Sequence, residues 1–132
     1  MIKKIVKNIS KISGSLHNMN DLIKKSGHNI ILPFYHAVTD DCPIHINNLY
    51  EPRSVESFKS DLDFLLEHFE SISLKRLLEI KHNEEIPDKN YFHLTFDDGL
   101  SEFYNVVAPI LKEKKIHATV FLNSDFIDNK KM

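Results

Sequence analysis

Two adjacent carboxylates, Asp97 and Asp98, follow an apolar and aromatic run at residues 91–96 and precede Gly99. A run of this length and composition predicts a buried β-strand. Burying unpaired charge costs roughly several kcal/mol, so two acidic residues have no role inside a hydrophobic core. Ligands of α/β proteins collect at the carboxyl ends of strands. The sequence therefore predicts a functional site at Asp97 and Asp98.

The chemistry open to this pair follows from how side chains alternate along a strand. If strand geometry persists through the pair, Asp97 and Asp98 point to opposite faces and take different roles. Gly99 permits a sharp turn directly after them. This arrangement suits hydrolysis by an activated water, with one carboxylate as a metal ligand and the other as general base. The structural alternative is that the pair only caps the next helix, although capping needs one carboxylate rather than two.

Composition and charge exclude several classes of protein. The 132 residues suffice for one modest domain, and the formal net charge of -2 argues against a nucleic-acid partner. Cys42 is the only cysteine, which excludes an intrachain disulfide and a thiolate metal cluster. No apolar run approaches the roughly 20 residues that span a bilayer, and no signal-peptide pattern is present. A cytoplasmic or membrane-peripheral location is expected.

The elements that position the acidic pair are predicted from periodicity and turn residues. An amphipathic helix is expected over residues 2–16; it could lie on an anionic membrane surface, but packing of its isoleucine stripe on the domain is favoured. Pro33 removes one hydrogen-bond donor from the first strand and indicates an edge or a bulge there. The remaining expected elements are a strand at 29–38, an irregular segment at 40–53, a helix at 55–69 capped by Ser54, a short strand or turn at 71–73, a helix at 74–80 with buried leucines, a helix at 103–111 capped by Ser101 and made irregular by Pro109, and a strand at 116–122. Their order predicts an α/β fold of mostly parallel strands with crossover helices.

The pentapeptide Thr95-Phe96-Asp97-Asp98-Gly99 resembles the first motif of the NodB-like polysaccharide deacetylases, carbohydrate esterase family four. The resemblance extends over roughly residues 30–127. The resemblance implies a (β/α) barrel, present here as a partial barrel. It divides the chain into an N-terminal amphipathic helical segment at 1–28 and the N-terminal part of a polysaccharide deacetylase-like domain at 29–132.

The resemblance also implies a function. Members of this family are metal-dependent hydrolases of non-peptide carbon–nitrogen bonds. They remove N-acetyl groups from amino-sugar polysaccharides with a divalent metal, commonly zinc. Carried over to this sequence, Asp97 is the general base, Asp98 is a metal ligand, and the partner is an N-acetylated glycan. His36, at the end of the first strand, is a candidate substrate contact or ligand if its strand neighbours that of Asp98.

The sequence departs from the family after the acidic motif. The family completes its metal site with a His-x-x-x-His pair several tens of residues further on, whereas His117 is the only histidine after Asp98 here. The expectation is a chain truncated before that motif, with an incomplete ligand set and weak or no activity alone. His93 is expected to pack in the interior, and His117 has no assigned role.

Other functions compete with a deacetylase. A non-catalytic carbohydrate-binding or scaffold remnant is the main alternative, and a half barrel would leave sheet edges open to self-association. Haloacid-dehalogenase-type phosphatases need two aspartates separated by one residue, and Phe96 or Gly99 falls on one of those positions. Receiver domains carry their acidic pair near the start of the domain, whereas Asp97 and Asp98 lie late in this chain.

Overall fold

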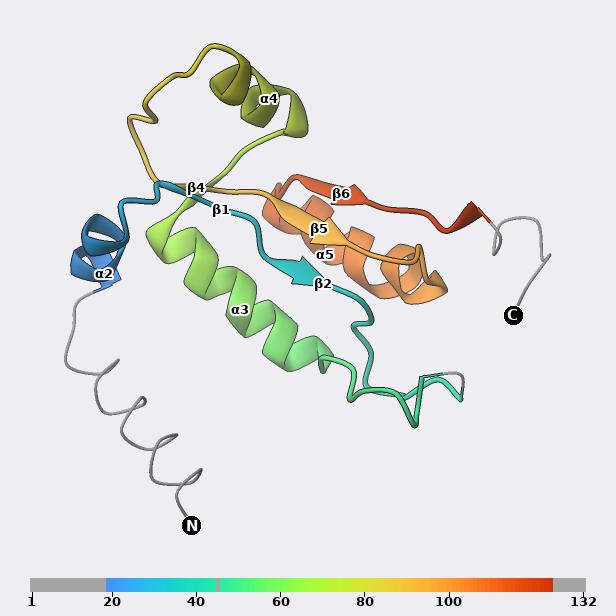
Figure 1. Ribbon diagram of the computed structural model, residues 1–132. Coiled ribbons are helices and arrows are strands. Elements are labelled where there is room, and N and C mark those ends of the chain that lie inside the picture. The colour runs from blue at the N-terminus through green and yellow to red at the C-terminus, as the bar shows by residue number, and fades with distance from the viewer. Residues whose placement is uncertain (1–18, 45, 125–132) are drawn as a thin grey trace.

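A computed structural model describes residues 19–44 and 46–124 (Figure 1). The helix expected over residues 2–16 lies outside these residues, and the division at residue 28 stays a prediction. Helix α2 (Met19–Ser26) is followed by Gly27, whose φ of 68° is the left-handed conformation that glycine adopts without strain. The helix therefore ends at a residue that turns the chain toward β1 (Ile30–Ile31).

The strands form two short sheets in which every pairing is parallel. One sheet has the order β1-β4-β3 and the other β2-β5-β6. The strands are β1 (Ile30–Ile31), β2 (Phe34–Tyr35), β3 (Glu70–Ser71), β4 (Tyr91–Phe92), β5 (Leu94–Phe96) and β6 (Ala118–Val120). The predicted α/β fold of parallel strands is confirmed. The sheets are small and not closed, so the partial barrel stays a prediction.

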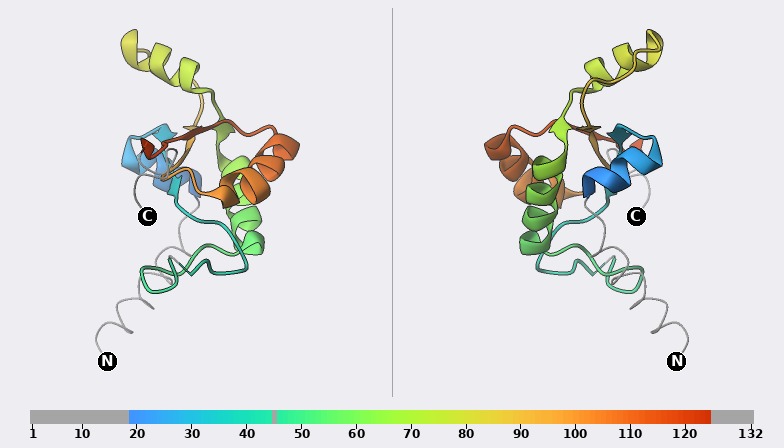
Figure 2. Two further views of the ribbon diagram at one scale, coloured as in Figure 1. Left: turned by 90° about the vertical axis from the view of Figure 1, so that its right-hand side faces the viewer. Right: turned by 90° about the vertical axis from the view of Figure 1, so that its left-hand side faces the viewer.

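Helices connect the parallel strands, as a parallel sheet requires. Helix α3 (Val55–His68) joins β2 to β3, α4 (Leu74–His82) joins β3 to β4, and the segment holding α5 (Ala108–Lys114) joins β5 to β6. In Figure 2, α3 and α5 lie on one side of the strands while α4 projects away from them. This position of α4 explains why Leu74 and Leu78 are 43% and 54% exposed, against the prediction that the leucines of this helix are buried.

The single strand expected at 29–38 is wrong in detail, because β1 and β2 are separate. Pro33 has no N–H to donate to the neighbouring strand, so regular pairing lapses between them. Both β1 and β2 are edge strands, as Pro33 indicated. Hydrogen bonds donated to this segment by the neighbouring β4 and β5 segment continue past Pro33. The donors and acceptors are the amides of Tyr91, His93, Thr95 and Asp97 and the carbonyls of Asn29, Ile31, Pro33 and Tyr35, respectively.

The helix starts show where local signals succeeded and failed. Ser54 caps α3, its hydroxyl accepting a hydrogen bond from the Ser57 amide at 3.2 Å, as predicted. After the acidic pair the chain forms a π-helix, η1 (Phe103–Val107), without a side-chain cap, so the predicted cap by Ser101 is wrong. The wider π turns come immediately before Pro109, which confirms the predicted irregular start.

The core lies between the strands and the two helices that cover them. Phe58 and Leu62 of α3 are fully buried, as are Phe92, Leu94 and Phe96 of the central strands. Among the residues described, no helix is both long and apolar enough to cross a membrane.

We expect Leu62→Ala to lower the free energy of unfolding by about 3 kcal/mol, because it removes a fully buried side chain and leaves a cavity. Leu66→Ala is the matched control, since Leu66 lies on the same helix and is 42% exposed. We expect its cost to be below about 1 kcal/mol. Urea unfolding of both variants measures the difference, and equal costs would contradict the position assigned to the core.

Candidate functional site

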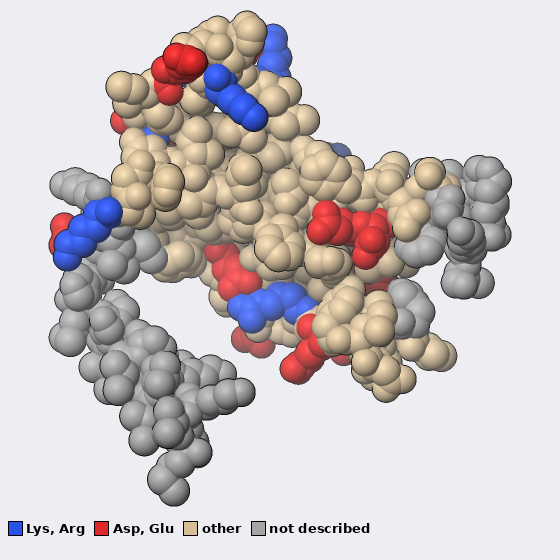
Figure 3. Space-filling model, viewed as in Figure 1, with Lys and Arg blue, Asp and Glu red and all other residues tan. Residues whose placement is uncertain are grey.

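Asp97 lies directly after β5, where strands on both sides fix its backbone. Its amide donates to the carbonyl of Tyr35 at 3.1 Å. On the other side, the Phe121 amide donates to the carbonyl of Phe96 at 2.8 Å. The acidic pair is therefore placed at the carboxyl end of the central strand, as the sequence predicted. In Figure 3, acidic side chains gather over this end of β5.

Strand geometry does not persist through the pair. β5 ends at Phe96, and Asp98 has a φ of 69°, followed by 65° at Gly99. The prediction that Asp97 and Asp98 point to opposite strand faces is therefore wrong for Asp98. A left-handed non-glycine residue costs roughly 1–3 kcal/mol, and such residues cluster at active and ligand sites. Two left-handed residues in succession turn the chain sharply at the point where the carboxylates are displayed.

His36 pairs with Asp97 across the sheet. Its Nε2 lies 3.7 Å from Oδ2 of Asp97, and the two side chains are 40% and 39% exposed. The register explains this contact: Tyr35 is opposite Phe96, so the next residues, His36 and Asp97, face each other. The condition set for His36 in the sequence, that its strand neighbours that of Asp98, is therefore met, and its contact is with Asp97. An exposed pair of this kind adds little stability, about 1 kcal/mol at most, but both groups remain open to a ligand.

Tyr50 is a part of the site that sequence reasoning missed. Its ring centroid lies 5.7 Å from that of His36, with the planes at 60°. The pKa of the Tyr50 hydroxyl is raised by burial and by the nearby charges of Asp98 and Glu102. The only signal in the sequence was the irregular segment at 40–53, which carries no pattern that singles out one residue.

His93 is a satisfied core histidine, which confirms its predicted packing role. It is 1% exposed, with Nδ1 2.8 Å from the carbonyl of Ile72 and Nε2 2.8 Å from the hydroxyl of Thr119. A carbonyl only accepts, so Nδ1 carries the proton and Nε2 accepts from Thr119. His93 lies between β4 and β5 and hydrogen-bonds to Ile72, directly after β3, and to Thr119 of β6. Both ring nitrogens are therefore occupied and unavailable to a metal.

The structure bears on helix capping and on metal binding by the acidic pair. The helix that follows the pair has no side-chain cap, which argues against a capping role. Asp98 and His36 offer the oxygen and nitrogen donors that divalent metals bind. Within residues 19–44 and 46–124, however, no three histidine, cysteine or acidic side chains converge to hold a metal.

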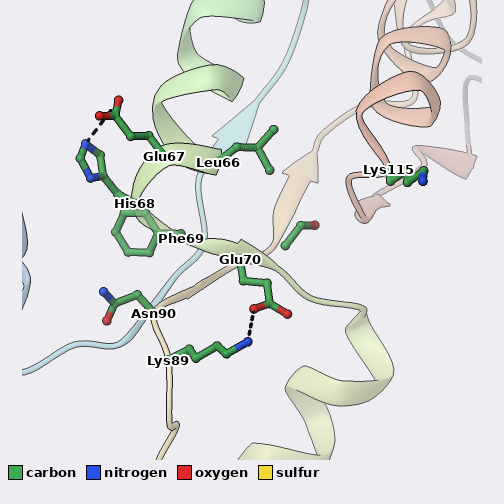
Figure 4. A pocket seen from close by; sticks show the side chains of 9 residues that line it. Leu66, Glu67, His68, Phe69, Glu70, Lys89, Asn90 and Lys115 are labelled. Carbon is green, nitrogen blue, oxygen red and sulfur yellow. Dashed lines mark hydrogen bonds and ion pairs between the residues drawn. The ribbon is translucent and has the colours of Figure 1, made fainter.

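A hollow of about 530 Å³ lies at the opposite end of the strands, around β3 and the residues that precede β4 (Figure 4). Four of its lining side chains are paired: Lys89 Nζ lies 2.7 Å from Glu70 Oε2, and His68 Nε2 lies 3.9 Å from Glu67 Oε2. The acidic motif is not part of its lining. The hollow is therefore separate from the candidate site, which is the acidic motif at the carboxyl end of the strands.

Gly99 is predicted to favour the shape of the acidic turn. A Cβ built there would lie 2.5 Å from Cδ2 of Leu122, and its φ of 65° adds a conformational cost. Gly27 is a matched control, with a φ of 68° and nothing within 4 Å of a built Cβ. We expect Gly27→Ala to lower the free energy of unfolding by about 1–2 kcal/mol through φ alone.

Gly99→Ala is expected to cost slightly more than its control, because the end of the exposed Leu122 side chain must also rotate away. Urea unfolding of the two variants isolates the effect of that contact. A Gly99→Ala protein as stable as the wild type would show that the turn does not need glycine.

The fold and the site define a class of protein: an α/β protein of parallel strands that displays a pair of carboxylates at the end of a central strand. Residues 84–132 match the model of a family described as polysaccharide deacetylase. A search of curated proteins gave no match. The resemblance to NodB-like deacetylases that the pentapeptide predicted is confirmed by the family match and by the solved structures described next.

Three solved structures are similar to this chain. The Streptococcus pyogenes deacetylase PplD, in complex with acetate, has 29% identity and a TM-score of 0.65 over 76% of this chain and 45% of that one. A de-N-acetylase from Aggregatibacter actinomycetemcomitans has 25% identity and a TM-score of 0.63 over 75% of this chain and 39% of that one. IcaB from Ammonifex degensii has 22% identity and a TM-score of 0.59 over 70% of this chain and 37% of that one, and shows the fold alone. The chain spans less than half of each of these proteins.

Proposed function

We propose that this chain carries the acidic part of the active site of a hydrolase that removes N-acetyl groups from an amino-sugar polysaccharide. The observation that carries the proposal is the Asp97–Asp98 pair at the end of β5, with His36 3.7 Å from Asp97. The similarity to deacetylases supports the reaction class. PplD was solved with acetate, which is the product of removing an acetyl group.

Asp97 is proposed as the general base. Its side chain is 39% exposed and its backbone is held by β2, so the carboxylate is both accessible and fixed in position. In the reaction, Asp97 accepts a proton from the water that attacks the acetamido carbonyl. The proton then passes from Asp97 to the leaving nitrogen as the carbon–nitrogen bond breaks, and the products are acetate and a free amine on the sugar. His36 orients the Asp97 carboxylate and faces the substrate from the neighbouring strand.

A divalent metal, for which we propose zinc, would polarise the acetamido carbonyl in such a site, and Asp98 is the residue expected to hold it. One carboxylate binds such a metal weakly. We therefore propose that the 132-residue chain alone binds metal weakly and hydrolyses its substrate slowly. Binding of an N-acetylated glycan without hydrolysis is the second candidate function, favoured by the incomplete ligand set among the residues described. Self-association through the sheet edges stays a prediction.

The experiment that tests the proposed function is acetate release from an N-acetylglucosamine oligomer, with added zinc or with a chelator. Slow release that requires both the metal and Asp97 would support it. Release at ordinary enzymatic rates would contradict the proposed weakness of the chain. Release that is unchanged by Asp97→Asn would contradict the role of the acidic pair.

A further inference from the structure

The segment at 46–53 carries Tyr50 and is firmly attached at its end. The Thr39 amide donates to the carbonyl of Arg53 at 3.0 Å, and the Arg53 amide donates to the carbonyl of Ala37 at 3.1 Å. The Arg53 side chain binds Asp61 of α3 through two hydrogen bonds, with Nε 2.9 Å from Oδ2. The chain therefore returns to the end of β2, beside His36, and is fixed to the helix behind it.

The turn before Tyr50 is also fixed. The amide of Tyr50 donates to the carbonyl of Ile46 at 3.3 Å, and Ile46 is only 4% exposed. The Tyr50 ring lies 5.7 Å from the His36 ring, and His36 in turn contacts Asp97. Tyr50 is 37% exposed, so part of its side chain is free to meet a ligand that reaches Asp97.

We propose that Tyr50 binds the sugar ring whose acetamido group faces Asp97, with its aromatic ring against the sugar and its hydroxyl donating a hydrogen bond to it. The proposal rests on the proposed function and names a further substrate-binding residue of that site. A sugar ring presents both C–H groups and hydroxyls, and a tyrosine offers a matching apolar face and a polar end.

The Tyr50 hydroxyl can act as the donor of this hydrogen bond. Burial, together with the charges of Asp98 and Glu102, raises its pKa, so the hydroxyl keeps its proton at neutral pH.

The test measures binding of an N-acetylglucosamine tetramer to the full 132-residue chain by NMR titration. We expect Tyr50→Phe, which keeps the ring, to weaken binding roughly 3–10-fold through loss of one hydrogen bond. Tyr50→Ala should weaken it further. Leu49→Ala is the matched control from the same segment, since Leu49 is 74% exposed, and should bind within about 2-fold of the wild type. The His36 ring signals, recorded without ligand, report whether Tyr50 only supports that ring.

Normal tetramer affinity in both Tyr50 variants would overturn the proposal, as would equal weakening by Leu49→Ala or no binding by the wild type. Shifted His36 signals with unchanged affinity would show a structural role instead and would also overturn it. These results are separate from the proposed function, which is judged by acetate release and its need for Asp97. If release needs Asp97 while the Tyr50 variants bind normally, the function stands and the role of Tyr50 fails.

Discussion

Asp97→Asn is expected to reduce acetate release from an N-acetylglucosamine oligomer by about 10³-fold, within the range that general bases contribute. Asparagine has nearly the same shape as aspartate, but its amide cannot accept the proton that the attacking water loses. The Asp97 backbone bond to Tyr35 is unaffected, and the exposed pair with His36 contributes little to stability. The loss should therefore appear in turnover, without a change in unfolding.

The matched control for this prediction is Asp63→Asn. Asp63 is a 65% exposed carboxylate of α3 that pairs with Lys114. Its substitution removes the same chemical group outside the site, and the rate should remain within about 2-fold of the wild type. A similar loss in both variants would mean that overall charge, rather than a base at Asp97, controls the rate.

Asp98→Asn is expected to weaken zinc binding at least roughly 10–100-fold. Losing a residue that only supports a metal ligand already costs about this much, and Asp98 is proposed as a direct ligand. Asparagine adopts the left-handed conformation about as readily as aspartate, so the φ of 69° at this position is retained. The effect can then be attributed to the lost negative oxygen ligand. Competition with a zinc-sensitive dye measures the affinity of each variant.

Asp97→Asn serves as the control for zinc affinity, because the proposed base is not the proposed ligand. It should lower zinc affinity much less than Asp98→Asn does. If the two substitutions weaken zinc equally, the division of roles between the carboxylates is wrong, and the pair acts as one acidic site.

The position of the acidic pair was predictable because local chemistry decides it. Aromatic and β-branched residues before Asp97 indicate a buried strand, and charges at its end must lie outside the core. Phe58 and Leu62 likewise follow a clear helical period, and both are buried. Ser54 caps its helix as its position suggested, because this interaction spans only three residues.

Features that depend on tertiary contacts escaped sequence reasoning. The left-handed φ of Asp98 is set by the turn between β5 and η1, and nothing in an Asp-Asp pair reveals it. The contact of His36 with Asp97 depends on strand register, where an error of one residue changes the partner. Tyr50 reaches His36 through the attachment of Arg53 to α3. Leu78 follows a helical period but is exposed, because α4 projects away from the strands.

We propose that the end of β5 binds a divalent metal through Asp98, next to Asp97 as the base. Titration of the ¹⁵N-labelled chain with Mn²⁺ tests it most directly, because a paramagnetic ion broadens the amide signals of residues close to it. We expect the signals of Asp97, Asp98 and Gly99 to broaden first, and we expect Asp98→Asn to remove this effect. Broadening centred on Glu67 and Glu70, in the hollow at the opposite end of the strands, would contradict it.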